Sequence, residues 1–202
     1  MASMSTFIGK IGQGVKPNQF SVSIPYPAGI TDVTAGDDEL TNLLCKSAAL
    51  PGSNLGVIEV PFRGRTIKIA GDRTFDTWSA TFFNDKDMKT RAFFEAWLNS
   101  INSHDGNASS NPNLTGEAAG AQGIYSTTIK VNQLERGTEA ENAQIIRTYD
   151  LKFAFPTSVS QIDLAYDSND QIEEFTVEFQ YSFWQVNKGG RGGASANPGL
   201  EN

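Results

Sequence analysis

Alternating apolar and polar residues predict a chain built mainly from β-strands. The pattern is clearest from Phe175 to Phe183, where aromatic or aliphatic residues occupy every second position and polar residues lie between them. This alternation places one face of a strand in a core and the other in solvent. Similar but weaker patterns predict strands at 18–26, 43–50, 57–61, 65–69, 75–83, 124–134, 145–155 and 161–166.

Glycine, proline and short polar residues interrupt the alternation where the chain is expected to turn. A hairpin turn is predicted at Phe62-Arg63-Gly64, between two of the strands. Further turns are predicted at 70–72, 156–158 and 167–170.

One segment, residues 86–101, has the three- and four-residue spacing of an amphipathic helix. Its apolar stripe consists of Met88, Phe93, Phe94, Trp97, Leu98 and Ile101. Asn84 or Asp85 is expected to cap the helix at its N-terminus. Many strands and a single helix predict a mainly β protein, an antiparallel β-sandwich or open barrel with the helix over one face or end.

The predicted elements divide the chain into three parts. Residues 1–17 are glycine-rich and are predicted to form an arm that only a partner would order. Residues 18–186 form the β domain, with loop insertions at 28–42 and 102–123. Residues 187–202 are of low complexity and are predicted to be a flexible tail.

Composition narrows the class of protein. A chain of 202 residues is long enough to bury the core of one domain. Its net charge of −7 argues against a nucleic-acid-binding protein, which normally presents a basic face. A single cysteine excludes an intrachain disulfide framework. No segment is expected to serve as a signal peptide or a membrane helix.

Charge is unevenly distributed along the chain. No Lys or Arg occurs from Phe153 to Asn187, and this stretch contains six acidic residues: Asp163, Asp167, Asp170, Glu173, Glu174 and Glu178. Two interpretations stay open, a solvated face that protects a sheet edge and a surface that repels nucleic acid.

Basic residues instead gather around the hairpin predicted at 57–69. They are Arg63, Arg65, Lys68 and Arg73, and Glu59, Asp72 and Asp76 are interleaved with them. This mixture favours paired charges at a subunit contact over binding of phosphate. Arg63, Arg65, Asp72 and Arg73 are therefore candidate assembly contacts.

The sequence contains no constellation typical of catalysis, cofactor binding or metal binding. His104, the only histidine, lies in a loop after the predicted helix, and Cys45 has no histidine to activate it. The stretch that begins at Asp167 has partial calcium-loop spacing, but Ile172 occupies the position where the sharp turn requires glycine. No cofactor is predicted.

Several segments, in order, resemble the tail tube proteins of contractile-tailed bacteriophages. The strongest match is AGDRTFDTW, Ala70 to Trp78. The others are the strand from Asn18, the CKSAALPG segment at 45–52, the turns at 156–159 and 167–169, and the final strand at 175–184. The resemblance spans most of 18–184.

This resemblance implies a structural, non-enzymatic β-sandwich subunit of the virion tail. Its subunits would close into hexameric rings that stack as a hollow tube inside a contractile sheath and conduct DNA during ejection. The implied partners are the tail sheath, baseplate or hub, terminator and tape measure proteins, with assembly in the bacterial cytoplasm. The six acidic residues are candidates for the lumen, because a phosphate polymer must slide past without sticking.

Two alternatives stay open. One is the inner tube of a contractile injection system that is not a phage, which genes encoding capsids or effectors nearby would distinguish. The other is a monomeric β-sandwich that binds a small molecule or carbohydrate, whose sign would be exposed aromatic residues beside a deep pocket.

Overall fold

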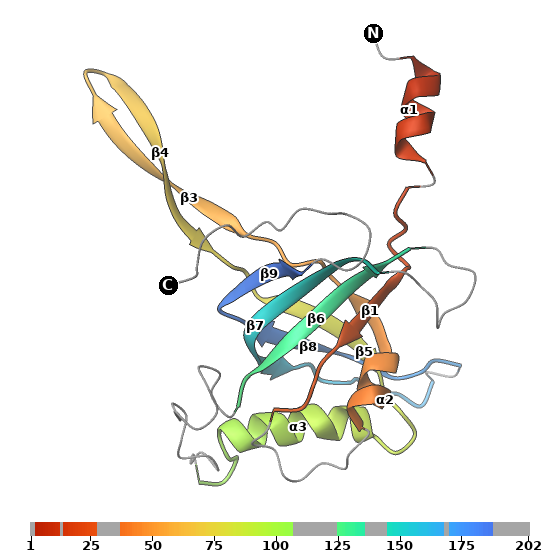
Figure 1. Cartoon of the computed structure of the whole chain (residues 1–202). Coiled ribbons are helices and arrows are strands. Elements are labelled where there is room, and N and C mark those ends of the chain that lie inside the picture. The colour runs from red at the N-terminus through yellow and green to blue at the C-terminus, as the bar shows by residue number, and fades with distance from the viewer. Residues whose placement is uncertain are drawn as a thin grey trace.

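The computed structural model describes residues 3–12, 14–27, 37–106, 125–135, 145–167 and 170–187, and the fold is mainly β, as predicted (Figure 1). The strands are β1 (Phe20–Ser23), β2 (Cys45–Ala48), β3 (Asn54–Phe62), β4 (Arg65–Thr74), β5 (Trp78–Phe83), β6 (Thr127–Leu134), β7 (Ile145–Val159), β8 (Glu174–Gln180) and β9 (Phe183–Asn187). The helices are α1 (Met4–Ile11), α2 (Asp37–Leu43) and α3 (Lys89–Ile101).

The body consists of two antiparallel sheets that share β7. The first half of β7 lies between β6 and β9, and β1 pairs with β6; this sheet, β1-β6-β7-β9, is called sheet A. The second half of β7 pairs with β8, and β5 and β2 follow; this sheet, β7-β8-β5-β2, is called sheet B. The described strands form an open arrangement and do not close into a barrel.

The turn predicted at 156–158 is wrong, because β7 continues through these residues. Phe153 has a positive φ of 58°, and the pairing with β8 shifts register between Pro156 and Ser158. These irregularities bend β7 from one sheet into the other. Pro156 is tolerated because β7 is the edge strand of sheet B at this point.

The last predicted strand is two strands in the structure. β8 ends before Tyr181 in sheet B, and β9 begins at Phe183 in sheet A. The backbone N–H of Ser182 donates to the carbonyl of Lys152 at 3.0 Å across the break. The alternation changes phase across the break. In β8, Phe175, Val177 and Phe179 are buried in the core, whereas in β9 Trp184 packs on it. Phe183 pairs with Lys152 and lies on the other face of sheet A, so its predicted place on the core face is wrong.

Helix α3 lies along one end of the sheets and closes the core (Figure 1). Phe94 packs on Phe82 of β5 and Phe179 of β8, with ring centroids 5.0 Å and 5.9 Å away. Trp97 is fully buried, and its indole N–H donates to the carbonyl of Tyr125 at 2.7 Å. The predicted stripe is therefore confirmed at its centre, although Met88 precedes the helix and is exposed.

The predicted hairpin is confirmed and is longer than expected. Arg63 and Gly64 both have positive φ, as a two-residue turn between right-twisted strands requires. The turn predicted at 70–72 is wrong: β4 runs through it to Thr74, because Gly71 and Asp72 form a bulge in β4 opposite Gly56 of β3. The hairpin projects from the body as a separate two-stranded sheet (Figure 1).

Three other expectations differ from the structure. The arm contains a helix, α1, and the insertion predicted as a loop at 28–42 ends in helix α2. Residues 161–166 form no regular strand. Residues 28–36 and 107–123 of the predicted insertions and residues 188–202 of the predicted tail lie outside the described residues. Among the helices of the described part of the chain, none has the length and apolar character needed to cross a membrane.

Candidate assembly surface

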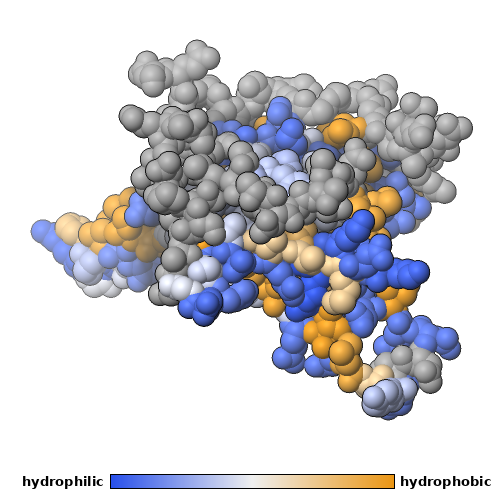
Figure 2. All heavy atoms as spheres, turned by 90° about the horizontal axis from the view of Figure 1, so that it is seen from below, coloured by the Kyte–Doolittle hydropathy of each residue, from blue (hydrophilic) through white to orange (hydrophobic). Residues whose placement is uncertain are grey.

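The β3–β4 hairpin carries apolar side chains that nothing in the described chain covers. Every residue of β3 is exposed, and all but Gly71 in β4 are exposed. Figure 2 shows hydrophobic surface on this projecting lobe, at the left of the view. An exposed two-stranded hairpin is marginally stable alone, so such a surface is typical of an interface.

The apolar residues are concentrated on one face of the hairpin. Cross-strand pairing places Ile58 opposite Ile69, and Val60 opposite Ile67. Side chains two residues apart share a face, so Phe62 extends this apolar face toward the turn. The other face is mixed, and there Glu59 and Lys68 form an ion pair of 3.6 Å.

The predicted assembly contacts Arg63, Arg65, Asp72 and Arg73 all lie on this hairpin. Arg63 and Arg65 are at its turn, where the Arg63 guanidinium lies 5.4 Å from the Phe62 ring centroid. Asp72 and Arg73 are near its base. None of the four forms an ion pair with another described residue, so their charges remain available to a partner.

Helix α1 is a second uncovered apolar element. Ser3 begins it, and the side chain of Ser3 accepts a hydrogen bond from the backbone N–H of Thr6. Its apolar residues recur at the helical spacing and are exposed by half or more: Met4, Phe7, Ile8 and Ile11. None of the residues of α1 is buried. The prediction of a glycine-rich arm did not include this stripe, although the spacing of the four residues is present in the sequence.

Sheet A presents two free edges and a polar face. In the described chain no strand pairs with the outer side of β1 or of β9. On the face opposite the core, the amide of Asn132 donates to the hydroxyl of Ser21 at 3.1 Å and accepts from Thr148 at 2.8 Å. Lys152 pairs with Asp150 at 3.6 Å on the same face.

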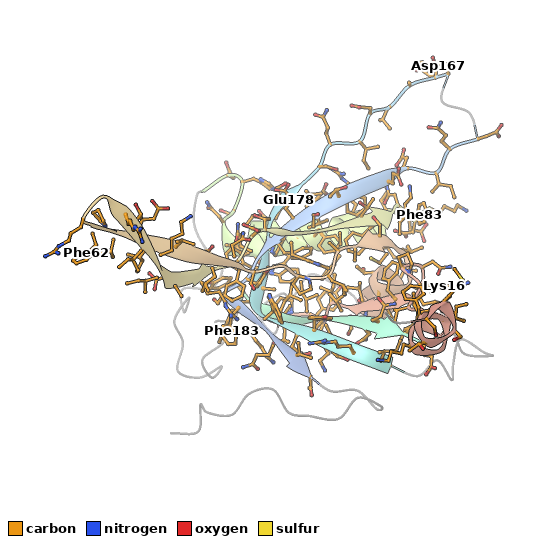
Figure 3. All side chains as sticks on the ribbon, turned by 90° about the horizontal axis from the view of Figure 1, so that it is seen from above. Lys16, Phe62, Phe83, Asp167, Glu178 and Phe183 are labelled. Atoms are coloured by element: carbon orange, nitrogen blue, oxygen red, sulfur yellow. The ribbon has the colours of Figure 1, made fainter. Side chains whose placement is uncertain are left out.

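The six acidic residues do not form one cluster. Asp163, Asp167 and Asp170 lie on the connection between β7 and β8, and Asp167 is at the tip of that projection (Figure 3). Two others are held near sheet B: Glu173 accepts from the amide of Asn84 at 3.0 Å, and Glu174 pairs with Lys46. The sixth, Glu178, is exposed on β8.

Cys45 and His104, the two residues considered for catalysis, make contacts within the local structure. Burial raises the pKa of the Cys45 thiol to about 12, which outweighs a weak hydrogen bond to the carbonyl of Ser47 and disfavours the nucleophilic thiolate. The backbone N–H of His104 donates to the side chain of Asn99 at 3.2 Å, after the end of α3. Within the described residues, no group of three or more His, Cys, Asp or Glu side chains could hold a metal ion.

Comparison with known proteins identifies relatives along nearly the whole chain. The family model described as "Phage tail tube protein" matches residues 15–187. Tail tube protein gp19 of Enterobacteria phage T4 is 32% identical over 174 residues, which cover 86% of this chain and 93% of gp19. The tail tube protein of Serratia phage KSP90 is 26% identical over 185 residues, covering 90% and 95%.

Solved structures share the fold at lower sequence identity. A chain in the sheath–tube complex of an extracellular contractile injection system, PVC, has a TM-score of 0.58 and 19% identity, with 93% of this chain and 99% of that chain covered. A chain in the baseplate of the anti-feeding prophage has a TM-score of 0.53 and 13% identity, covering 84% and 92%.

Proposed function

We propose that this chain, which belongs to the phage tail tube protein family, is the structural subunit of the inner tube of a contractile phage tail. The observation that carries the proposal is the match to gp19 over most of both chains. The alternative of a monomeric carbohydrate-binding protein is set aside on this ground. A tube of a contractile injection system remains the second candidate, favoured by the shared fold with the PVC chain.

We propose further that subunits close into six-membered rings through the free edges of sheet A. An unpaired strand edge offers N–H and C=O groups that a neighbour's strand can satisfy. β9 of one copy would meet β1 of the next, and repetition of this head-to-tail contact closes a ring. The four strands contributed by each subunit would then form one continuous inner barrel.

The polar face of sheet A is the surface we propose for the lumen. The opposite face is packed in the core, where Val22, Val131 and Leu151 are buried. Hydroxyl and amide groups bond one another there, as Ser21 and Asn132 do. Lys130 and Lys152 are on the same face, and Asp150 pairs with Lys152.

The acidic lumen predicted from sequence stays a prediction. Asp167 projects on the side of the molecule away from Phe183 of β9 (Figure 3). A ring lined by sheet A would therefore place this acidic projection outside the channel, toward the sheath. The proposed partners are the sheath, baseplate or hub, terminator and tape measure proteins, with assembly in the bacterial cytoplasm and DNA passing through the lumen.

Electron microscopy of the assembled protein tests these proposals. Purified full-length chain, mixed with its baseplate, is expected to form stacked rings, and a reconstruction should show six subunits with sheet A inside. Persistence of monomers on a baseplate template would contradict the tube function. A tube lined by the acidic projection would restore the sequence prediction for the lumen. Neighbouring capsid genes would favour a phage, and effector genes an injection system.

A further inference from the structure

We propose that α1 of one copy packs onto the apolar face of the β3–β4 hairpin of a neighbouring copy. This inference rests on the proposed tube function, because it requires a second copy of the chain. In this contact, the apolar stripe of α1 and the apolar face of the hairpin cover each other. The N-terminal arm then takes part in assembly.

The helix side of the contact is a narrow apolar stripe. Met4, Phe7, Ile8 and Ile11 follow one another at spacings of three, one and three residues, so they share one side of α1. Their exposed fractions are 79%, 62%, 59% and 53%, respectively. An eight-residue helix without any buried residue has no packing to stabilise it within its own chain, and helices of this length are marginal in water.

The hairpin side is an apolar face of matching length. Ile58, Val60 and Phe62 on β3 lie beside Ile67 and Ile69 on β4. From Ile58 to Phe62 the strand rises about 13 Å, and eight residues of helix rise about 12 Å. One side of α1 therefore covers the length of this face.

The occupant must come from another copy. Phe62, at the end of the hairpin, and Lys16, beyond the C-terminus of α1, lie at opposite ends of the molecule (Figure 3). Figure 1 likewise shows α1 and the hairpin pointing away from the body in different directions. Complementary patches on different parts of one subunit make a head-to-tail contact, which propagates from copy to copy.

A lipid surface is the weaker occupant for α1. Amphipathic helices that lie on membranes carry several basic residues on the polar face. α1 carries only Lys10, and a membrane would leave the hairpin face uncovered. Each copy of the chain carries one α1 stripe and one hairpin face, so every stripe can pair with a face of another copy. This favours contact between copies.

Cysteine cross-linking tests the contact directly. In a Cys45→Ser background, Ile8→Cys and Ile69→Cys are combined in the full-length chain, and assembled tubes are oxidised. A ladder of covalent multimers is expected on a non-reducing gel. The matched control combines Lys10→Cys with Lys68→Cys, which lie off the two apolar faces, and is expected to give at least about tenfold less multimer.

A second measurement separates the contact from folding. Phe7→Ser combined with Ile8→Ser should lower tube yield at least about tenfold, because the lost apolar burial is worth more than one decade in the association constant. Thermal unfolding of the monomer should stay unchanged, since α1 buries nothing in the core. Thr6→Ser combined with Lys10→Gln is the control. It changes the polar side of α1, leaves the apolar stripe intact, and should assemble as the wild type does.

The outcomes distinguish the contact from the tube function. Assembly of the wild type, together with oxidised Ile8→Cys, Ile69→Cys tubes that give no ladder, would overturn the contact and leave the tube function intact, even if the Phe7 and Ile8 substitutions blocked assembly. Unchanged assembly of the Phe7→Ser, Ile8→Ser variant would do the same. Failure of the wild type to assemble on its baseplate would overturn both. Binding of α1 to vesicles of anionic lipid, with no ladder, would assign the helix to a membrane instead.

Discussion

Asp85 shows how a single side chain fixes the start of α3. Its carboxylate accepts a hydrogen bond from the backbone N–H of Thr90 at 2.9 Å, whereas Met88, at the geometric cap position, has a positive φ of 55° and no side-chain acceptor. Partial burial alone would raise the pKa of Asp85. Hydrogen bonds from the backbone of Thr90 and Lys89 outweigh that effect and hold the pKa below its ordinary value of 3.8.

Asp85→Ala is expected to lower the free energy of unfolding by about 1 kcal/mol at pH 7. Since the folded state lowers the pKa, the unfolded state binds the proton more readily, and the stabilisation is present above pH 3.8 and lost as the pH falls through the folded-state value. The difference between wild type and variant should therefore shrink at low pH. Urea denaturation of the monomer at pH 7 and pH 3 measures both.

Two further variants isolate the cap. Asp85→Asn keeps an acceptor and should lose less stability at pH 7, with no titration of its own. Asp87→Ala removes a neighbouring exposed carboxylate that is not the observed cap. Equal losses for Asp85→Ala and Asp87→Ala would contradict the capping role.

The roles of individual residues in α3 were predicted well from the sequence. Asn84 or Asp85 was expected to cap α3, and Phe93, Phe94 and Trp97 were expected to face the core, because capping and helical spacing are local. The sequence did not reveal that the cap reaches past Met88, since that depends on a positive φ.

The β3–β4 hairpin is the element that we propose for contact with a neighbouring copy, and two glycines shape it. At Gly71, an added Cβ would lie 3.2 Å from the backbone carbon and oxygen of Gly56 and 3.3 Å from Cγ1 of Ile58. These contacts are tighter than side chains normally make, and two of the neighbouring atoms belong to the backbone. The close approach coincides with the bulge in β4, where Gly71 and Asp72 lie opposite Gly56 of β3.

Gly71→Ala is expected to loosen the hairpin and lower tube yield. Overpacking of this kind costs about 1–3 kcal/mol. We expect this cost to lower the free energy needed to open β3 and β4 locally. Amide hydrogen exchange in the hairpin should accelerate, while unfolding of the body changes little. Gly52→Ala is the control, because nothing lies within 4 Å of a Cβ at that position. Equal exchange in the two variants would refute the close-packing argument.

Element boundaries were harder to predict than element types. The turns expected at 70–72 and 156–158 contain residues that usually end strands, and the structure absorbs both as irregularities within β4 and β7. Bulges depend on the partner strand, which local sequence does not specify. The division of 175–183 into β8 and β9 was hidden because the alternation in the sequence runs on through Phe183, although β9 turns Trp184 toward the core.

For the whole molecule, the fold class and the family could be predicted from the sequence, but the location of the exposed apolar surface could not. A mainly β fold and the tail tube family are confirmed. The exposed apolar face of the hairpin could not be predicted, because an alternating strand that is buried within its own subunit has the same pattern as one buried by a neighbour. Only the fold shows that β3 and β4 stand apart from the core.

The charges at the base of the hairpin test whether this region meets a neighbouring subunit. Asp72 and Arg73 are exposed and form no ion pair with another described residue, so their reversal should change the free energy of unfolding by less than about 0.5 kcal/mol. A neighbouring subunit would meet the reversed charge at close range. Asp72→Lys and Arg73→Glu are therefore expected to impair tube assembly while the monomer keeps its thermal stability.

Ionic strength distinguishes electrostatic repulsion from a local change in the turn. Tube yield of both variants, counted by negative-stain microscopy, should recover in part as salt rises, because about 1 M salt shortens the Debye length to roughly 3 Å. Asp105→Lys, an equal reversal on the exposed loop after α3, should assemble normally at all salt concentrations. If both hairpin variants gave wild-type yield at low salt, Asp72 and Arg73 would be structural residues of β4 and not assembly contacts.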